Sequence, residues 1–218
     1  MNQKSILFIT LGALLIAFGG AAYWYNAKQA AEKTALASNN SEALEQFHSP
    51  RVGSPSAKVT IVEFMDPACE TCSAFHDAVK ATMKQYQGKV KLVIRYAPFH
   101  PGSDKAVEIL EASRNLGKFN DVLDLMYGTQ HGWASHHNPQ PELIWEYLAY
   151  YKFDVAALKK NVDSVATAKL IAIDLADAKT LGVNKTPTFF VNGKPLPSFG
   201  YEQFQKLVAD EVAAAYNK

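Results

Sequence analysis

Cys69 and Cys72 are the two cysteines of this chain, and they are spaced as Cys-x-x-Cys. They follow an apolar, strand-like run and a turn that contains Pro67, and a segment with helical spacing of apolar residues begins at the pair. A thiol at a helix N-terminus ionises more easily, and the thiolate is the attacking group in thiol–disulfide exchange. The pair therefore predicts exchange chemistry, in which Cys69 forms a mixed disulfide and Cys72 resolves it.

Two structural roles compete with this interpretation. A disulfide between Cys69 and Cys72 would close a very short loop, which constrains the unfolded chain little. A structural zinc site usually needs four ligands, and the sequence has neither a second Cys-x-x-Cys nor a paired histidine motif. His131, His136 and His137 lie close together in the sequence, but such a run is more typical of a polar loop, and we expect no metal site there.

Periodicity predicts an α/β fold. The expected strands are 58–64, 90–96, 186–191 and 194–196, and the expected helices are 69–87, 103–116, 118–127, 141–151, 154–162, 164–181 and 201–216. Ser103 is the expected N-cap of its helix, and Asn192-Gly193 is a strong signal for a hairpin turn. A strand–helix–strand unit and a hairpin can share one mixed sheet whose faces are covered by helices.

Glu63 interrupts the first apolar strand. Alternation places Val59, Ile61 and Glu63 on one face of this strand, and Val62 and Phe64 on the other. Burial would raise the pKa of Glu63, as a proton acceptor near neutral pH requires. The alternative is a glutamate at the strand end that reaches solvent.

The N-terminal segment differs from the rest of the chain. Residues 5–27 carry no charge, and their apolar part is longer than the roughly 7–15 residues of a signal-peptide core and closer to the roughly 20 of a spanning helix. Tyr23-Trp24-Tyr25 is typical of an interfacial aromatic belt, and Gly20-Ala21-Ala22 leaves cleavage open. We expect residues 1–27 to be a membrane anchor or signal segment that contacts the inner membrane through residues 6–25.

Export follows from this expectation. The body of the protein would lie on the periplasmic or extracytoplasmic side, where disulfides persist. The formal net charge of +1 gives no electrostatic footprint for nucleic acid, so we expect no nucleic-acid partner.

The residues around the cysteines resemble the thioredoxin fold. Val62-Glu63-Phe64 precedes the pair, and Thr186-Pro187-Thr188 opens a later strand. The helical block of residues 100–181 resembles the insertion of the DsbA-like branch of thiol–disulfide oxidoreductases. The resemblance implies a thioredoxin-fold core of residues 56–99 and 182–218 with a mixed central sheet and an inserted helical subdomain. Residues 28–55 would form a linker.

The resemblance also implies roles for individual residues. Pro187 would be a cis-proline beside the active cysteines, with a substrate groove along its loop; an ordinary trans-proline at a strand start is the alternative. Thr186 would face the sulfurs, where its hydroxyl could bond a thiolate. Glu63 would help to move the proton of Cys72.

Glu70 and Thr71 are expected to tune the redox chemistry. Strongly oxidising relatives carry proline and histidine between the cysteines. The negative charge of Glu70 opposes a second negative charge on Cys69, which should raise the thiol pKa and make the disulfide a weaker oxidant.

Two functions remain open at this point. The first is an exported thiol–disulfide oxidoreductase that acts on cysteines of other exported proteins, exchanges electrons with a membrane redox partner, and needs no cofactor beyond its own Cys69–Cys72 disulfide. The direction of the reaction, oxidation or reduction and isomerisation, is not determined. The second is a substrate-binding or chaperone module that uses the groove and does not need its cysteines.

Overall fold

Two apolar strands, β2 (Val59–Met65) and β3 (Val90–Tyr96), pair in parallel at the centre of a five-stranded sheet with the order β1-β3-β2-β4-β5. The outer strands all pair antiparallel: β1 (Arg51–Gly53) with β3, β4 (Thr188–Val191) with β2, and β5 (Lys194–Pro195) with β4. The sheet is therefore mixed, and the predicted α/β class is confirmed.

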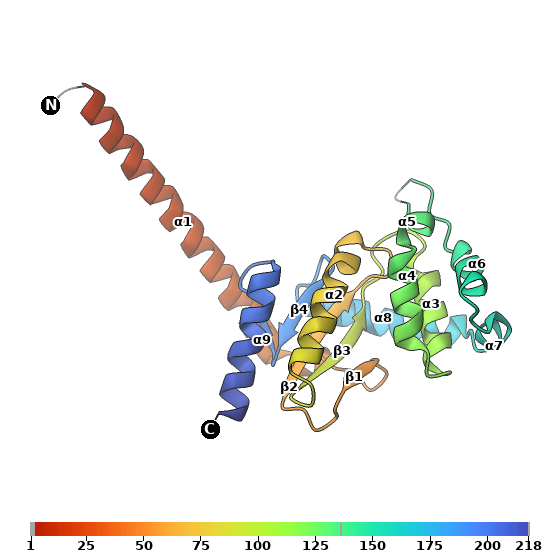
Figure 1. Ribbon diagram of the computed structural model, residues 1–218. Coiled ribbons are helices and arrows are strands. Elements are labelled where there is room, and N and C mark those ends of the chain that lie inside the picture. Colours follow the sequence, from red (N-terminus) through yellow and green to blue (C-terminus); the bar gives the residue numbers. More distant parts are fainter. Residues whose placement is uncertain (1–2, 136, 218) are drawn as a thin grey trace.

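The structure, a computed structural model, describes residues 3–135 and 137–217, with side chains from residue 11 onward. Its helices are α1 (Gln3–Asn39), the 3-10 turn η1 (Ser41–Ala43), α2 (Glu70–Gln85), α3 (Ser103–Arg114), α4 (Phe119–Gly128), α5 (Gln130–Trp133), α6 (Leu143–Tyr150), α7 (Val155–Lys160), α8 (Ser164–Thr180) and α9 (Tyr201–Tyr216). Helices α2 and α9 lie on one face of the sheet and α8 lies on the other, while α3 to α7 extend to one side (Figure 1).

Alternation along β2 divides its side chains between two hydrophobic cores. Val59 and Ile61 belong to the core shared with α2 and α9, whereas Val62 and Phe64 belong to the core shared with α8 and the end of α1. Glu63 must therefore point to the same side as α2, the helix that carries the cysteines, as the strand pattern predicted.

The segment of residues 28–55 is more ordered than a spacer. Helix α1 continues to Asn39, and Ala37 and Leu44 are buried in the core beneath α8. Strand β1 then adds an edge strand beside β3, with Val52 opposite Leu92. A strand of three residues has too few side chains to show periodicity, so the sequence did not predict it.

Ser103 is not the N-cap of α3, contrary to the prediction. Gly102 occupies the cap position with a φ of 80°, a left-handed conformation that favours glycine. The hydroxyl of Ser103 instead donates to the buried carboxylate of Asp66. A tertiary partner has therefore replaced the local capping interaction.

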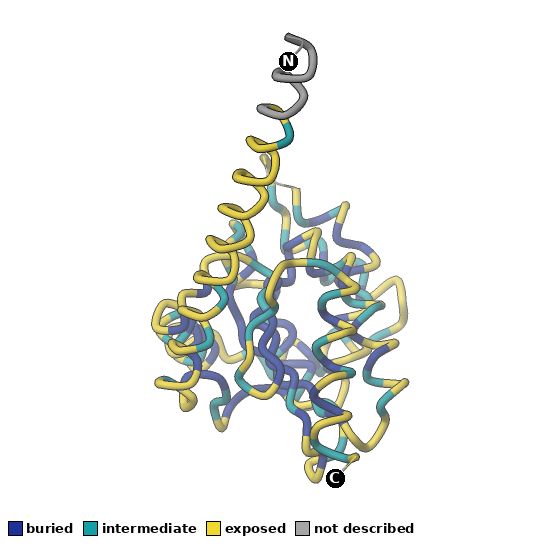
Figure 2. The backbone as a smooth tube through the Cα atoms, turned by 90° about the vertical axis from the view of Figure 1, so that its left-hand side faces the viewer, coloured by how far each residue is buried: buried dark blue, intermediate teal, exposed yellow. Residues whose placement is uncertain are grey.

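Helix α1 projects away from the body of the protein (Figure 1), and most of its length is exposed (Figure 2). Its large apolar side chains Leu14, Ile16 and Phe18 are all exposed. Within the part of the chain whose side chains are described, no helix carries an apolar stretch long enough to cross a membrane. The predicted anchor spans residues 1–27, and the side chains of its first ten residues lie outside the described part of the structure.

A fully buried arginine connects the sheet to the inserted helices. Arg95 of β3 donates from Nε to Asp174 Oδ1 at 2.9 Å and from Nη2 to Asp177 Oδ2 at 2.6 Å. His48 Nε2 lies 2.8 Å from the same Asp174 Oδ1, and the backbone N–H of Tyr96 donates to Asp174 Oδ2. Asp174 thus joins β3, α8 and the segment before β1.

We expect Asp174→Ala to lower the free energy of unfolding by about 3–5 kcal/mol, because it leaves a buried guanidinium without its main partner. Urea denaturation monitored by circular dichroism would measure the change. Asp210→Ala is the matched control, because Asp210 forms an exposed pair with Lys206 and should contribute less than about 1 kcal/mol. Equal losses in the two variants would contradict a stabilising role for the Arg95 network.

Candidate active site

The cysteine pair lies where β2 meets α2. A short turn follows β2, and Cys69 is the N-cap residue of α2 in an extended conformation. Its N–H donates to the carbonyl of Asp66 at 3.1 Å. Both cysteines are free thiols and both are buried, Cys69 at 5% exposure and Cys72 at 0%. Cys69 is therefore the more accessible of the two thiols.

The loop before β4 closes over the first cysteine. The Thr186–Pro187 peptide bond is cis, as the resemblance implied. In its thiol form, Cys69 Sγ donates to the carbonyl oxygen of Thr186 at 3.3 Å, across 117 positions of sequence. The fold thus brings together Cys69, Cys72, Thr186 and Pro187, which the sequence singled out separately.

Hydrogen bonds lower the pKa of Cys69 to about 5. The largest cause is the hydrogen bond from the Cys72 thiol; the Thr186 side chain and the N–H groups of Thr71 and Cys72 act in the same direction, and burial opposes them. The helix N-terminus provides these N–H groups because the first turn of a helix leaves them unpaired. Cys69 is therefore a thiolate at neutral pH.

The pKa of Cys72 is shifted upward, opposite to that of Cys69. Burial raises its pKa far above the usual range of a thiol, and the neighbouring Cys69 and Glu63 add to this effect. A thiol in this condition attacks a disulfide only when a nearby group accepts its proton.

Glu63 is placed to be that group. Its side chain is 6% exposed, so it is a buried carboxyl rather than a strand-end glutamate that reaches solvent. Burial, and then the charge on Cys69, raise its pKa to about 8. A carboxyl with such a pKa holds a proton at neutral pH and can exchange it with a neighbouring thiol.

The two residues between the cysteines are exposed. Glu70 lies in the first turn of α2, but its carboxylate is not among the main influences on the pKa of Cys69. Thr71 contributes through its backbone N–H. The expected effect of Glu70 on the Cys69 pKa stays a prediction.

Asp66 is a site residue that the sequence analysis missed. It is completely buried, and its carboxylate accepts hydrogen bonds from the N–H of Ala68, the N–H and Nδ1 of His100, and the hydroxyl of Ser103. These bonds fix the turn before Cys69 against the start of the insertion. An aspartate directly after a buried strand was the available signal.

An exposed aromatic surface lies beside the cysteines. Phe75 of α2 stacks on Tyr201 with ring centroids 4.2 Å apart and contacts Phe199 at 4.7 Å. Tyr201 and Phe199 are each 46% exposed. Such a surface can contact apolar side chains of a bound peptide.

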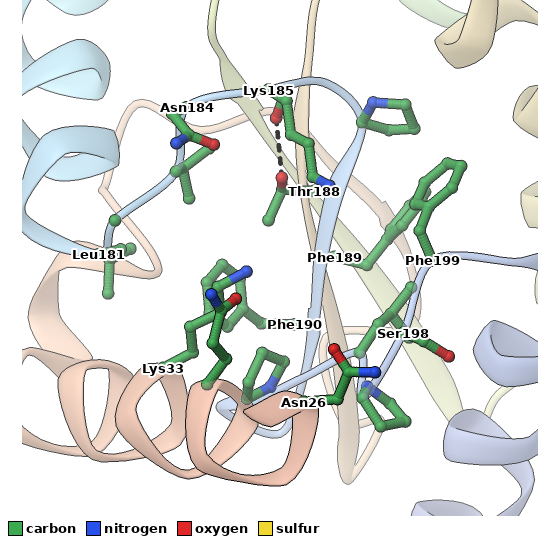
Figure 3. A pocket seen from close by; sticks show the side chains of 17 residues that line it. Asn26, Lys33, Leu181, Asn184, Lys185, Thr188, Phe189, Phe190, Ser198 and Phe199 are labelled. Atoms are coloured by element: carbon green, nitrogen blue, oxygen red, sulfur yellow. Dashed lines mark hydrogen bonds between the residues drawn. The ribbon is translucent and has the colours of Figure 1, made fainter. Parts of the chain in front are cut away.

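A pocket of about 210 Å³ borders the proline loop. Thr188 and Phe189 of β4 line one side and Phe199 another, and Asn26 and Lys33 of α1 face them (Figure 3). Helix α1 therefore forms part of the wall next to the loop that carries the cis-proline.

The polar loop near Gly132 gives no ligand cluster. Across residues 3–135 and 137–217, no three His, Cys, Asp or Glu side chains are grouped as metal ligands. His136, a member of the histidine run in the sequence, lies outside the described residues.

Comparison with known proteins gives one family. Residues 45–210 match the family described as Thioredoxin. Disulfide bond formation protein D of Bacillus subtilis is 25% identical over 177 residues, which cover 75% of this chain and 77% of that protein. A Na(+)/H(+) antiporter NhaA of Herminiimonas arsenicoxydans is 31% identical over 144 residues, which are 66% of this chain and 22% of the antiporter. The chain thus spans about a fifth of the length of such antiporters.

Solved structures share the same architecture. A thioredoxin-like oxidoreductase from Silicibacter pomeroyi superposes with a TM-score of 0.67 at 25% identity, over 80% of this chain and 98% of that one. Oxidised BdbD from Bacillus subtilis superposes with a TM-score of 0.65 at 25% identity, over 75% of this chain and 92% of that one. Alpha-DsbA1 of Wolbachia pipientis superposes with a TM-score of 0.69 at 18% identity, over 81% of this chain and 96% of that one. At that identity the likeness supports the fold alone.

We expect the reduced protein to react with iodoacetamide at a rate that rises with pH through a midpoint near 5, because the reactive form is the Cys69 thiolate. Thr186→Val should move this midpoint upward by about one unit, since it removes one hydrogen bond to a charged group. Alkylation rates followed by mass spectrometry would measure both. A midpoint near 9, the ordinary thiol value, would contradict the assignment.

The free energy of unfolding should depend on the same ionisation of Cys69. Because the folded-state pKa of Cys69 lies below its ordinary value, its contribution is fully present above about pH 9 and is lost as the pH falls through about 5. Cys69→Ser, measured alongside the reduced protein, should lack this dependence.

Proposed function

The chain belongs to the thioredoxin family, and we propose that it is a DsbA-like thiol–disulfide oxidoreductase that exchanges disulfides with cysteines of exported proteins. The observation that carries the proposal is the pair of opposite pKa shifts at Cys69 and Cys72. One thiol is ready to attack or to leave as a thiolate, and the other stays protonated until a mixed disulfide has formed. This asymmetry is what two-step exchange requires.

In the reductive direction, the Cys69 thiolate attacks a substrate disulfide and releases one substrate thiolate. In the mixed disulfide Cys69 carries no charge, so the pKa of Glu63 falls and Glu63 can lose its proton to solvent. Cys72 then gives its proton to the Glu63 carboxylate and attacks the Cys69 sulfur, which releases the second substrate thiolate and leaves the Cys69–Cys72 disulfide. The oxidative direction is the reverse: a substrate thiolate attacks Cys69, and Glu63 returns the proton to Cys72. Either cycle moves two electrons, which a membrane redox partner would supply or remove.

The Cys69 pKa bears on direction. A value of about 5 lies between about 7 for thioredoxin and about 3.5 for the strong oxidant DsbA. A more stable thiolate makes the corresponding disulfide more oxidising. We therefore infer an oxidising strength between the two, and the equilibrium potential against glutathione buffers would measure it.

Substrate binding follows from the surface around Cys69. An extended peptide can bond to the backbone of the Thr186–Pro187 loop, as a strand added at a sheet edge does. The exposed rings of Phe199 and Tyr201 would contact apolar side chains next to the substrate cysteine.

We expect Cys69→Ser to abolish exchange with a disulfide-containing peptide, and Cys72→Ser to retain the first attack and accumulate a mixed disulfide that mass spectrometry detects. Glu63→Gln should slow resolution by about 100-fold, since it removes the proton acceptor. Glu70→Gln, the matched control on the exposed side of the pair, should leave resolution nearly unchanged. If Cys69→Ser kept full activity toward its substrates, a binding module with non-essential cysteines would be the better description.

Anchoring at the inner membrane is part of the proposal. Residues 5–27 carry no charge, and the exposed apolar side chains of α1, such as Leu15, Ile16 and Phe18, have no protein partner to cover them in the described structure. A lipid bilayer would provide that cover. The body would then face the periplasm or the extracytoplasmic side.

Fractionation of cells that express the full-length protein should place it in the membrane fraction, resistant to carbonate extraction and accessible to protease from outside the cytoplasm. Replacement of Leu15 and Ile16 by aspartate should release it, because charges at the centre of a span are costly. Recovery of the unaltered protein in the soluble fraction would remove the anchor from the proposal.

A further inference from the structure

A second cavity lies on the opposite side of α2 from the proline loop. It encloses about 420 Å³ between α2, α4 and the sheet, where the thioredoxin core meets the helical insertion. Its wall is mainly apolar and includes Val79, Met83, Leu92, Ile94 and Leu123. A cavity of this size and lining, at the junction of two subdomains, is typical of sites for small molecules.

Two buried polar side chains, Tyr127 and Glu63, line this cavity. The hydroxyl of Tyr127, on α4, is buried and has no hydrogen-bond partner among the described residues. The carboxyl of Glu63, on β2, is 6% exposed and lines the same cavity. Buried polar groups in native proteins are normally paired, so an unpaired hydroxyl that faces a cavity indicates that something in the cavity bonds to it.

The two groups interact electrostatically with each other and with the cysteines. Glu63, Cys69 and Cys72 all raise the pKa of the Tyr127 hydroxyl through their charges, after the effect of burial. Tyr127 therefore stays a hydrogen-bond donor at any physiological pH, and Glu63, with a pKa of about 8, is a donor at neutral pH. The wall of the cavity thus presents two donors.

Polar residues also mark the rim of the cavity. Asp124 of α4 lies 2.5 Å from both His76 Nε2 and Lys80 Nζ of α2. These contacts join the two helices beside the cavity, and all three side chains line it. Side chains on the surface can rearrange to admit a molecule without any change in the core.

Water does not suit most of this space. A buried water molecule needs two to four polar partners, and Glu63 and Tyr127 could satisfy one or two waters between them. The remaining wall is hydrocarbon, which favours an apolar occupant.

We propose that this cavity binds a small, largely apolar molecule that carries one oxygen acceptor, such as an aromatic or aliphatic ketone. Its hydrocarbon part would pack on Val79, Met83 and Leu123, and its carbonyl oxygen would accept hydrogen bonds from Tyr127 and Glu63. This site is separate from the peptide groove at Thr186–Pro187, and the proposal does not depend on the redox function.

Isothermal titration of the reduced, full-length protein with benzylacetone tests the proposal. We expect saturable binding of one molecule, and Tyr127→Phe should weaken it about five- to tenfold, because one hydrogen bond is lost while the ring remains. Tyr150→Phe is the matched control, since Tyr150 is 75% exposed and does not line the cavity. Butylbenzene, which lacks the oxygen, should bind the wild type and Tyr127→Phe equally.

A second variant fills the space directly. Leu123→Trp should abolish benzylacetone binding while exchange at Cys69 persists, and circular dichroism would check that the variant is folded. Absence of saturable binding to the wild type would overturn the proposal, as would equal affinity for the wild type and Tyr127→Phe. Either result would leave water as the occupant at Glu63 and Tyr127.

Discussion

A negative charge on the Cys69 sulfur has to be stabilised within a largely buried site, and much of the structure serves this requirement. The N-terminus of α2 supplies N–H groups, Cys72 supplies a thiol, and the loop before β4 brings Thr186. These groups come from separate parts of the chain. They meet because β4 pairs with β2, the strand that leads into the cysteines, so that both approach the same end of the sheet (Figure 1).

The same surroundings shift the pKa values of neighbouring groups in opposite directions. Cys69 gains hydrogen bonds that outweigh its burial, whereas Glu63 and Cys72 are buried without comparable support for their charged forms. At neutral pH the site therefore holds one thiolate, one thiol and one protonated carboxyl. Separation of pKa values by environment is how a protein assigns distinct acid and base roles to groups that lie close together.

The sequence predicted the parts of this arrangement that depend on local pattern. The cysteine pair could be identified from its spacing alone. Side-chain periodicity predicted the strands around Val59 and Val90. Turn chemistry predicted the Asn192-Gly193 turn, and both of its residues have positive φ values. The proximity of the Thr186–Pro187 loop to Cys69 was predicted from the resemblance, because the 117 positions between Cys69 and Thr186 carry no local signal.

Other features could not be predicted because their partners are distant in sequence. The burial of Arg95 is explained by Asp174 and Asp177, which belong to the insertion, and by the carbonyl of Ala43. Ser103 matched a capping pattern but bonds to Asp66 instead. The unpaired hydroxyl of Tyr127 depends on how α4 packs against α2, which no pattern within either helix specifies.

The placement of the insertion has a consequence for synthesis. Cys69 and Cys72 leave the ribosome well before Thr186, since the whole helical block is made in between. Strand β2 gains its partner β4 only near the end of the chain, so a nascent chain exposes both thiols before the loop that covers them exists. During this interval Cys69 lacks its bond to Thr186. The full reactivity of the site is therefore acquired last, which limits disulfide exchange by incomplete chains.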